Sequence, residues 1–418
     1  MRSVGGGVTL KITRVATAVV EANFDWTIIR VETDNGMVGW GEAFFAPGLT
    51  STLRELGEFI RGRDPRDIEP IRRDMAQAAS AAGAGGQVHH AITGIEAALW
   101  DILGQHLKAP LWQVWGGKFR DHVAIYCDCH GGDALESLDS LLQPRELEWD
   151  KSRSQWNAQP GTATRDVLAE YTAEAYVKKA LQQVEKGFTF LKFDLDIPNP
   201  YSLDRYHRRL SVAEVPYLAQ LMVDVRHAIG TEVELAVDCH WKFSPDSSIQ
   251  LARALEPAQL AWLEDPVPPY NLDALKYVRD HSPVPILSGE NLYGSHEFRS
   301  LFERQAVAIV APDFQKVGGL AEGRSICHLA DQYFLPVAPH NIASPIGTMA
   351  SVHIAASIPN FLALEWHSSD VPFWSDMIHD GDLIHQGLIA VPSRPGLGVT
   401  PNEHTMRLYA KPGEPFFE

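Results

Sequence analysis

Three acidic residues recur at equal spacing in the middle of the chain: Asp238, Glu264 and Glu290. Each follows a short apolar segment of the kind that forms a buried strand. These segments are residues 233–237, 260–263 and 284–287. A repeated strand with an acid at its carboxyl end is typical of a parallel barrel, in which neighbouring strand tips meet. The pattern therefore predicts a barrel that brings three carboxylates to one point.

Three carboxylates at one point repel one another unless a cation lies between them. Because the side chains offer only oxygen atoms, Mg²⁺ is the expected ion, whereas Zn²⁺ would favour His or Cys. A single acid after a strand more often caps a helix or a turn. Three acids at equal spacing instead favour a metal site, and Mg²⁺ normally keeps positions open for water and substrate oxygens.

The size and composition of the chain suggest two domains and disfavour several partners. With 418 residues, 45% of them hydrophobic, the chain exceeds one typical domain and can bury a large core. A formal net charge of −17 disfavours binding to nucleic acid or to an anionic membrane. This charge says little about a small acidic substrate that meets a locally positive metal.

The cysteines and the N-terminal residues indicate in which cellular compartment the protein is expected. Cysteine occurs only at positions 127, 129, 239 and 327. This is too few and too uneven for a disulfide framework or a four-cysteine zinc site. Near the N-terminus, Lys11, Arg14 and Glu21 interrupt the apolar residues, so neither a signal peptide nor a membrane span is predicted. A reducing, cytoplasmic location is the expectation.

Residues 1–120 are predicted to form an α+β domain. Residues 9–19 and 25–32 alternate between apolar and polar positions like antiparallel strands, and the turn sequence Asp34-Asn35-Gly36 is predicted to join them. Two later segments have helical periodicity: residues 53–79 and 89–107.

Residues 121–379 alternate between strand-like and helix-like segments, which predicts βα units around a parallel sheet. Ser244-Pro245 and Asn271 are predicted to begin two of the helices. Eight strand candidates make a closed α/β barrel the expected architecture, with the site at the carboxyl ends of the strands. They are residues 123–127, 189–193, 233–237, 260–263, 284–287, 308–311, 335–338 and 361–364. Residues 380–418, rich in Gly and Pro, are predicted to pack back on the N-terminal domain.

The next two strand tips carry Asp313 and His340. A carboxylate beside an imidazole fixes its tautomer and raises its basicity, as a general base requires. The alternative is a structural His bonded to a nearby acid, since the chain contains 17 His. Because the pair directly follows the three acids in strand order, a catalytic base is favoured.

Three further strand-tip residues are candidates for catalysis. Glu365 follows the eighth strand candidate and could accept a hydrogen bond from a substrate carboxyl oxygen. Lys192, at the second tip, could balance charge developing on an enolate, although a surface lysine is the common alternative. His240 lies two residues after Asp238, so on an extended backbone it points to the same side and could protonate a leaving hydroxyl.

Together these motifs resemble the enolase superfamily, within its mandelate racemase-like group of acid-sugar dehydratases. The resemblance covers nearly the whole chain, because the barrel motifs match in order and the N-terminal part contributes three motifs. These are NGMVGWGE at residues 35–42, EAALWD at 96–101 and PLW at 110–112. The resemblance implies a modified (β/α)7β TIM barrel preceded by an α+β capping domain.

The resemblance also implies roles for the strand-tip residues. Asp238, Glu264 and Glu290 would bind Mg²⁺. By the same resemblance, His340, paired with Asp313, would abstract the proton α to a carboxylate, and Glu365 would stabilise the enediolate.

Within that family the motif of Asp238 and His240 resembles sugar-acid dehydratases of the galactonate, gluconate and mannonate type, where the His expels the 3-hydroxyl group. Racemases and several relatives carry Lys-x-Lys at the second tip, whereas this chain has Lys192-Phe193-Asp194. Asp194 thus replaces a lysine that acts as a base on the opposite face, which disfavours two-base racemisation. The predicted reaction is Mg²⁺-dependent elimination of water to give a 2-keto-3-deoxy acid.

Recognition of the distal substrate hydroxyls is assigned to Asp194, His130, Trp366 and His367. Long loops at strand tips usually shape a substrate site. The loops expected here are residues 131–165 and 197–209, with lid segments 21–26 and 44–50. The aromatic residues among them could equally pack between two domains. A hexonate, a pentonate or a diacid therefore stays open as the substrate.

Two other functions stay open. An epimerase or cycloisomerase of the same superfamily would keep the three metal ligands and produce no keto acid. A non-catalytic sugar-acid binding protein would need neither a base nor an acid, so the presence of His340 and His240 disfavours it. A homo-oligomer is expected, because relatives are usually symmetric assemblies.

Overall fold

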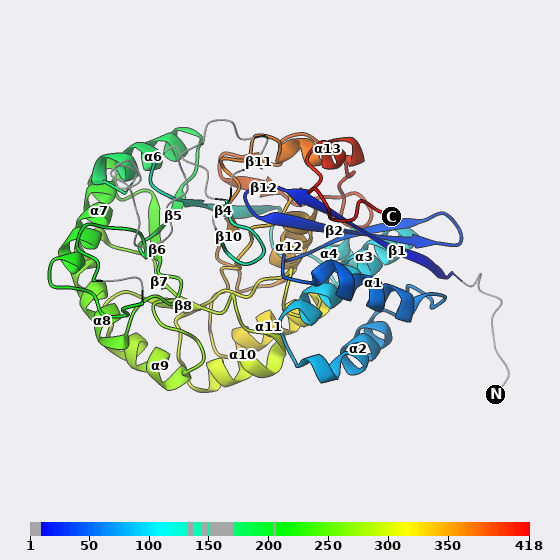
Figure 1. Cartoon of the computed structure of the whole chain (residues 1–418), viewed down its shortest axis with the longest axis horizontal. Helices are drawn as coiled ribbons and strands as arrows, with labels where there is room; N and C mark the ends of the chain where they lie inside the picture. Colours follow the sequence, from blue (N-terminus) through cyan, green and yellow to red (C-terminus); the bar gives the residue numbers. More distant parts are fainter. Residues whose placement is uncertain are drawn as a thin grey trace.

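The computed structural model describes residues 10–132, 137–143, 145, 147, 149, 171–203 and 206–418. An N-terminal α+β part, coloured blue to cyan, lies beside a barrel whose helices follow from green to orange (Figure 1). The C-terminal segment, coloured red, returns to the first strands (Figure 1). Most of the predicted insertion at residues 131–165 lies outside the described residues.

Three antiparallel strands form the N-terminal sheet, in the order β1-β2-β3. They are β1 (Ile12–Glu21), β2 (Asp25–Thr33) and β3 (Val38–Ala43). The prediction that Asp34-Asn35-Gly36 joins the first two strands is wrong. This turn joins β2 to β3, with Gly36 at a φ of 83° that glycine adopts without strain, whereas residues 22–24 join β1 to β2.

The helices of this part are α1 (Leu49–Ile60), α2 (Ile68–Ala78) and α3 (Gln87–Leu107), followed by the short α4 (Leu111–Val114) and, between α2 and α3, η1 (Ser80–Ala82). Helices α1 and α3 pack against the sheet, and α2 packs against both of them. The predicted helical segment 53–79 is two helices. Gly62, at a φ of 82°, and Pro65 lie between them, and both residue types disfavour a continuous helix.

A closed set of parallel strands forms the barrel. The strands are β4 (His122–Cys129), β5 (Phe190–Asp194), β6 (Glu234–Asp238), β7 (Leu263–Glu264), β8 (Ile286–Ser288), β9 (Ile309–Val310) and β10 (Leu364–Trp366). Strands β4 to β9 pair in sequence order, and β10 pairs with β4, so the first and last strands meet. The predicted α/β barrel with an α+β partner is confirmed.

The seventh strand candidate, residues 335–338, is reduced to isolated bridges. Val337 pairs with Val310 on one side and with Phe361 on the other. Pro336 and Pro339 flank this segment and have no N–H to donate, which prevents a longer ladder. The eighth strand begins at Leu364, about where its candidate segment ends.

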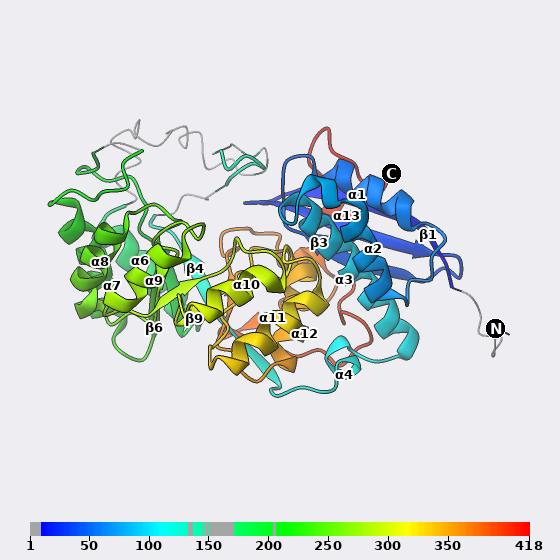
Figure 2. The same cartoon turned by 90° about the horizontal axis from the view of Figure 1, so that it is seen from below.

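Helices surround the barrel (Figure 2). They are α6 (Ala173–Glu185), α7 (Glu214–Ile229), α8 (Pro245–Ala254), α9 (Leu272–His281), α10 (Gly294–Glu303), α11 (Leu320–Gln332) and α12 (Pro345–Ser357), with the turn η2 (Glu256–Ala258) after α8. The predicted helix starts are confirmed, because the side chains of Ser244 and Asn271 accept hydrogen bonds at the first turns of α8 and α9.

The C-terminal segment contains η3 (Ser375–Met377), β11 (Ile384–His385), β12 (Leu388–Ala390) and α13 (Glu403–Leu408). It then pairs with β1 through two antiparallel bridges, which join Ala18 to Phe416 and Val20 to Ala410. Asp101 of α3 accepts a hydrogen bond from Leu397 N at 2.8 Å. The segment therefore contacts the N-terminal part, while β12 pairs with β4 of the barrel. None of the helices in the described ranges has the length and apolarity of a membrane span.

Candidate active site

The two-residue period of the strands determines which side chains point into the barrel mouth. Inside the barrel, a layer of buried apolar residues forms a floor, which includes Tyr126, Phe190, Trp262 and four smaller side chains at positions 236, 311, 338 and 363. Two positions further along each of these strands stands a polar residue, because alternate residues of a strand face the same side. These residues are Asp128, Lys192, Asp238, Glu264, Asp313, His340 and Glu365.

Glu290 reaches the same mouth in a different way. The floor residue of its strand is Leu287, three positions earlier rather than two. Between them Gly289 has a φ of 142°, which breaks the alternation of side chains after β8. The backbone turn therefore returns the Glu290 carboxylate to its neighbours.

Asp238, Glu264 and Glu290 form a compact carboxylate group. Each contributes one ligand oxygen, and these atoms lie within 4.8 Å of one another. All three side chains are buried. Glu264 Oε2 accepts a hydrogen bond from Trp262 Nε1 at 3.0 Å, whereas its Oε1 is buried without a hydrogen-bond partner among the described residues.

Lys192 lies among four buried carboxylates. Its Nζ is 2.7 Å from Glu365 Oε1, 3.0 Å from Asp238 Oδ2 and 3.2 Å from Glu264 Oε2. Asp128 Oδ2 is also 3.2 Å from this nitrogen. The Lys192 ammonium therefore lies among the acids of the barrel mouth and not at the protein surface.

Burial and crowding change the proton affinity of this group. Burial raises the pKa of Glu264 well above its ordinary value, and although Lys192 lowers it, the neighbouring carboxylates raise it further. Burial alone would lower the pKa of Lys192, but the surrounding carboxylates raise it well above its usual range. Negative charge therefore exceeds positive charge at the barrel mouth.

The donor set fits Mg²⁺. The three ligands are carboxylates, which this hard cation prefers. The buried, unbonded Oε1 of Glu264 is an acceptor that a cation would satisfy. A divalent charge would also relieve the repulsion that raises the pKa of Glu264.

His340 and Asp313 form a hydrogen-bonded pair. Their Nδ1 and Oδ2 atoms are 2.6 Å apart, and both side chains are buried. The other ring nitrogen, Nε2, lies 3.6 Å from Glu290 Oε2 and 3.9 Å from Glu365 Oε2. Burial alone would lower the pKa of His340, but Glu290, Glu365 and Asp313 raise it. The ring therefore directs Nε2 toward the carboxylate group.

Glu365 also positions the segment that follows His340. Its Oε2 accepts a hydrogen bond from Asn341 N at 3.0 Å, while its Oε1 meets Lys192. Burial alone would raise the pKa of Glu365, but Lys192 and His340 lower it below its ordinary range. An ionised Glu365 thus lies between the lysine and the imidazole.

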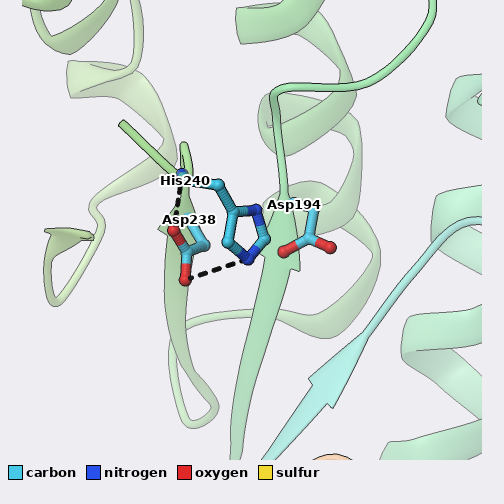
Figure 3. A group of neighbouring side chains, drawn as sticks. All are labelled: Asp194, Asp238 and His240. Carbon is cyan, nitrogen blue, oxygen red and sulfur yellow. Dashed lines mark hydrogen bonds and ion pairs between the residues drawn. The ribbon is translucent and has the colours of Figure 1, made fainter. Parts of the chain in front are cut away.

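His240 lies beside Asp238 and Asp194, at the tips of β6 and β5 (Figure 3). Its backbone N–H donates to Asp238 Oδ1 at 2.9 Å, its Nε2 is 3.8 Å from Asp238 Oδ2, and its Nδ1 is 3.0 Å from Asp196 Oδ1. The extended backbone assumed for this residue is wrong. His240 has a φ of 40° and Trp241 a φ of 58°, so a tight turn directs the imidazole back toward Asp238.

The four residues assigned to substrate recognition have different surroundings. Asp194 lies beside His240 (Figure 3). His367 Nε2 is 3.7 Å from Asp128 Oδ2, which places its ring in the barrel mouth. His130 Nε2 lies 3.4 Å from Asp370 Oδ2 at the rim.

Trp366 does not share this side of the strand. It stacks on Phe188 with ring centroids 5.6 Å apart and meets Trp374 edge to face. Residues 365 and 367 face the barrel interior, so the alternation of β10 directs Trp366 outward. These ring contacts are those expected of the packing alternative, and the assignment of Trp366 to substrate recognition stays a prediction.

Two lid segments from the N-terminal part cover the barrel mouth. Asn23 Nδ2 donates to His367 O at 2.7 Å, and Phe24 meets the His367 ring edge to face. Phe44 lies with its ring centroid 5.9 Å from that of His340. Both predicted lid segments thus contact residues at the strand tips.

Four residues of this site escaped the sequence reasoning: Asp128, Asp196, Asn291 and Lys316. Asp128 directly follows the apolar run 123–127, so the rule that found the other acids would have found it. Asn291 and Lys316 carry no comparable signal, because the contact between them joins residues that are 25 positions apart in the sequence. Asp196 is recognisable only through its distance from His240.

A closed parallel barrel with carboxylates, a lysine and an Asp–His pair at its strand tips, joined to an α+β part, defines a class of barrel enzymes with an acidic site at the barrel mouth. Residues 175–405 match the family described as enolase C-terminal domain-like. Residues 8–116 match the mandelate racemase/muconate lactonizing enzyme N-terminal domain. The chain belongs to the mandelate racemase/muconate lactonizing enzyme family of the enolase superfamily, which confirms the resemblance inferred from its motifs.

Relatives extend over almost the whole chain. A protein named D-xylonate dehydratase from Haloferax volcanii is 39% identical over 99% of this chain and 92% of its own length. A D-galactonate dehydratase family member from Musicola paradisiaca is 29% identical over 96% of this chain and 94% of its own. The crystal structure of a mandelate racemase/muconate lactonizing enzyme-like protein from Rubrobacter xylanophilus has a TM-score of 0.87 and 37% identity, covering 98% of this chain and 100% of that one.

Proposed function

We propose that this protein is a Mg²⁺-dependent dehydratase of a five- or six-carbon aldonic acid, which converts it to the 2-keto-3-deoxy acid and water. D-Xylonate is the first substrate to test, because the Haloferax volcanii relative carries that name. The observation that carries the proposal is that two imidazoles approach one carboxylate group. His340 Nε2 is 3.6 Å from Glu290 Oε2, and His240 Nε2 is 3.8 Å from Asp238 Oδ2.

Asp238, Glu264 and Glu290 would hold the Mg²⁺ ion. When bound, Mg²⁺ would neutralise negative charge on the substrate carboxylate and so make the α-proton more acidic. Lys192 adds a second positive charge at the same place, since its Nζ forms ion pairs with Asp238 and Glu264. Glu365 would accept a hydrogen bond from a substrate carboxyl oxygen that gains a proton.

His340 would remove the proton from C2 at its Nε2 atom. Asp313 holds Nδ1–H at 2.6 Å, so Nε2 carries the free electron pair, and the carboxylate stabilises the imidazolium that forms. The electron pair of the C2–H bond enters the enediolate.

His240 would donate a proton to the 3-hydroxyl group. As the C3–O bond breaks, its electrons leave with the oxygen, water departs, and the enediolate electrons form the C2–C3 double bond. The resulting enol takes a proton at C3 and becomes the 2-keto-3-deoxy acid. Asp196, 3.0 Å from His240 Nδ1, would hold the ring in place for this transfer.

The test is a screen of the full-length protein with Mg²⁺ against aldonic and aldaric acids, with keto acid trapped by semicarbazide. We expect one aldonate to give product and His340→Asn to lower kcat by about 10³-fold or more while Mg²⁺ binding is kept. Full activity of His340→Asn would overturn the assignment of the base. An absence of keto acid from every substrate would overturn the proposed reaction.

An epimerase or cycloisomerase is the second possibility within the family, and the exchange of the C2 proton in D₂O distinguishes it. For a dehydratase, His240→Asn should still exchange the C2 proton while its release of keto acid falls, because only the second step needs the acid. If the wild type inverts C2 and forms no keto acid, the enzyme is an epimerase. Tight binding of a sugar acid without exchange or product would indicate a binding protein.

A further inference from the structure

Lys316 is a buried lysine that the proposed reaction does not use. It lies in the loop between β9 and α11, and its side chain is 1% exposed. Among the described residues its ammonium forms no ion pair with a carboxylate; its contacts are Asn291 and the ring of Phe44. A buried ammonium without a carboxylate partner is unfavourable, so the local structure must compensate for it.

The first contact orients Asn291. Lys316 Nζ donates to Asn291 Oδ1 at 3.1 Å. An ammonium can only donate, so the carbonyl of the Asn291 amide must face it, and the NH₂ group must face the opposite way. That NH₂ group donates to Glu290 Oε1 at 3.0 Å. The lysine therefore decides which atom of Asn291 meets the carboxylate.

The orientation of Asn291 in turn gives the two carboxylate oxygen atoms of Glu290 different partners. Oε1 is held by Asn291, while Oε2 lies on the side of His340 Nε2, at 3.6 Å. Hydrogen bonds of this kind to a metal-ligating carboxylate orient the ligand and influence metal affinity. Without Lys316 the Asn291 amide could rotate and present its oxygen to Glu290, which would repel the carboxylate.

The second contact comes from the N-terminal part. Lys316 Nζ lies 3.9 Å from the ring centroid of Phe44, within the range of a cation–π interaction. Phe44 N also donates to Gln315 O at 3.2 Å, next to the lysine in the chain. The lid residue thus covers the ammonium and partly replaces its lost hydration.

We propose that Lys316 is a positioning residue for the metal centre, which fixes Glu290 through Asn291 and is itself held by Phe44 of the N-terminal part. This inference rests on the proposed function, since it takes Glu290 as a metal ligand. The affinity for Mg²⁺ would then depend on Lys316, which is not a ligand, and on its contact with Phe44 of the N-terminal part.

Calorimetric titration of the full-length protein with Mg²⁺ alone tests this. Lys316→Met keeps a long side chain and removes the donor, so the Kd for Mg²⁺ should rise about 10- to 100-fold. Asn291→Leu should raise Kd to a similar extent, and the double variant should be no weaker than the stronger single one, because both act through one path. Phe44→Leu should raise Kd roughly two- to fivefold.

Lys179→Met is the matched control. Lys179 is another buried barrel lysine, and its Nζ lies 3.3 Å from Asp370 Oδ1, with no contact to a proposed metal ligand. The Lys179→Met substitution should leave the Kd for Mg²⁺ unchanged even if it lowers the melting temperature. Thermal melts without metal identify any variant that fails to fold. If Lys316→Met does not fold, the Kd of Asn291→Leu for Mg²⁺, compared with that of the wild type, decides the test.

The outcomes separate this inference from the proposed function. If the wild type binds Mg²⁺ and both Lys316→Met and Asn291→Leu bind it equally well, the positioning role is overturned while the metal centre stands. Additive effects of these two variants would overturn the shared path. If the folded wild type binds no Mg²⁺, the metal centre itself, and with it the proposed function, is overturned.

Discussion

Glu42 of the N-terminal sheet accepts hydrogen bonds from Ser344, the residue that caps barrel helix α12. Ser344 N lies 2.9 Å from Glu42 Oε1, and the Ser344 hydroxyl donates to Oε2, as does Gly347 N at 2.9 Å. Ser344 ends the short segment that begins at His340. A side chain of one domain therefore holds the loop that carries the proposed base of the other.

Replacement of Glu42 by Gln should lower both stability and turnover. The Gln amide offers one acceptor oxygen where the carboxylate offers two, so donors at the start of α12 lose a partner. We expect the free energy of unfolding to fall by about 1–3 kcal/mol. The kcat should fall more than KM rises, because the loop positions the base. Denaturant unfolding and steady-state kinetics measure the two effects.

Asp101→Asn is the control for Glu42→Gln. Asp101 is also a buried carboxylate of the N-terminal part, and it accepts from Trp40 N at 3.0 Å, Gln105 Nε2 at 2.9 Å and Leu397 N at 2.8 Å. The Asp101→Asn variant should lose stability without a selective loss of kcat, since none of these donors belongs to the base loop. Equal losses of kcat in the two variants would contradict the special role of Glu42.

Asp313→Asn should lower kcat by about 10²- to 10⁴-fold with little change in the Kd for Mg²⁺. The amide cannot stabilise the imidazolium of His340, and it can hold the ring in the wrong tautomer. Steady-state kinetics with the active aldonate, together with calorimetry, provide the measurement. A variant that keeps wild-type kcat would show that the 2.6 Å contact is structural only.

Trp262→Phe should weaken Mg²⁺ binding about 10-fold, because it removes the indole donor 3.0 Å from Glu264 Oε2 and keeps an aromatic floor to the barrel. Trp100→Phe is a chemically matched control, since Trp100 Nε1 donates to the buried carboxylate of Glu96 at 2.8 Å on α3. Calorimetry should detect the difference in Kd. A similar Kd for both variants would argue against orientation of Glu264 by the indole.

His353 should make the protein less stable below neutral pH. Burial lowers the pKa of His353 from 6.5 to about 4, and its Nδ1 accepts from Trp112 N while its Nε2 meets Leu397 O. The unfolded chain gains a proton near pH 6.5 and the folded chain only near pH 4. The stability from neutral His353 is therefore complete above pH 6.5 and is lost as the pH falls toward 4.

This contribution amounts to at most about 3 kcal/mol for a shift of this size. Urea unfolding at several pH values between 4.5 and 7.5 should show a shallower pH dependence in His353→Gln than in the wild type. The glutamine can still contact Trp112 and Leu397 but carries no titrating group. Parallel pH profiles for the two proteins would exclude His353 as a source of the dependence.

Much of the site is determined by local sequence. An apolar run followed by a charged residue at the tip of a parallel strand located Lys192, Asp238, Glu264 and Asp313, because the two-residue period of a strand fixes which side chains face the interior. The change of pattern near residue 120 predicted an α+β part followed by βα units. The same period places Trp366 on the outer side of β10, between two inward-facing residues, where it stacks on Phe188.

Tertiary structure decided the rest, because the deciding contacts join residues far apart in the sequence. Only folding brings Lys192 among four carboxylates, turns His240 back toward Asp238, and places Phe44 over Lys316. Burial and neighbouring charge set the pKa of each group, and neither is visible in a linear chain. The sequence determined which residues stand at the barrel mouth; the closure of the barrel and its packing against the N-terminal part decided which atoms of those residues meet.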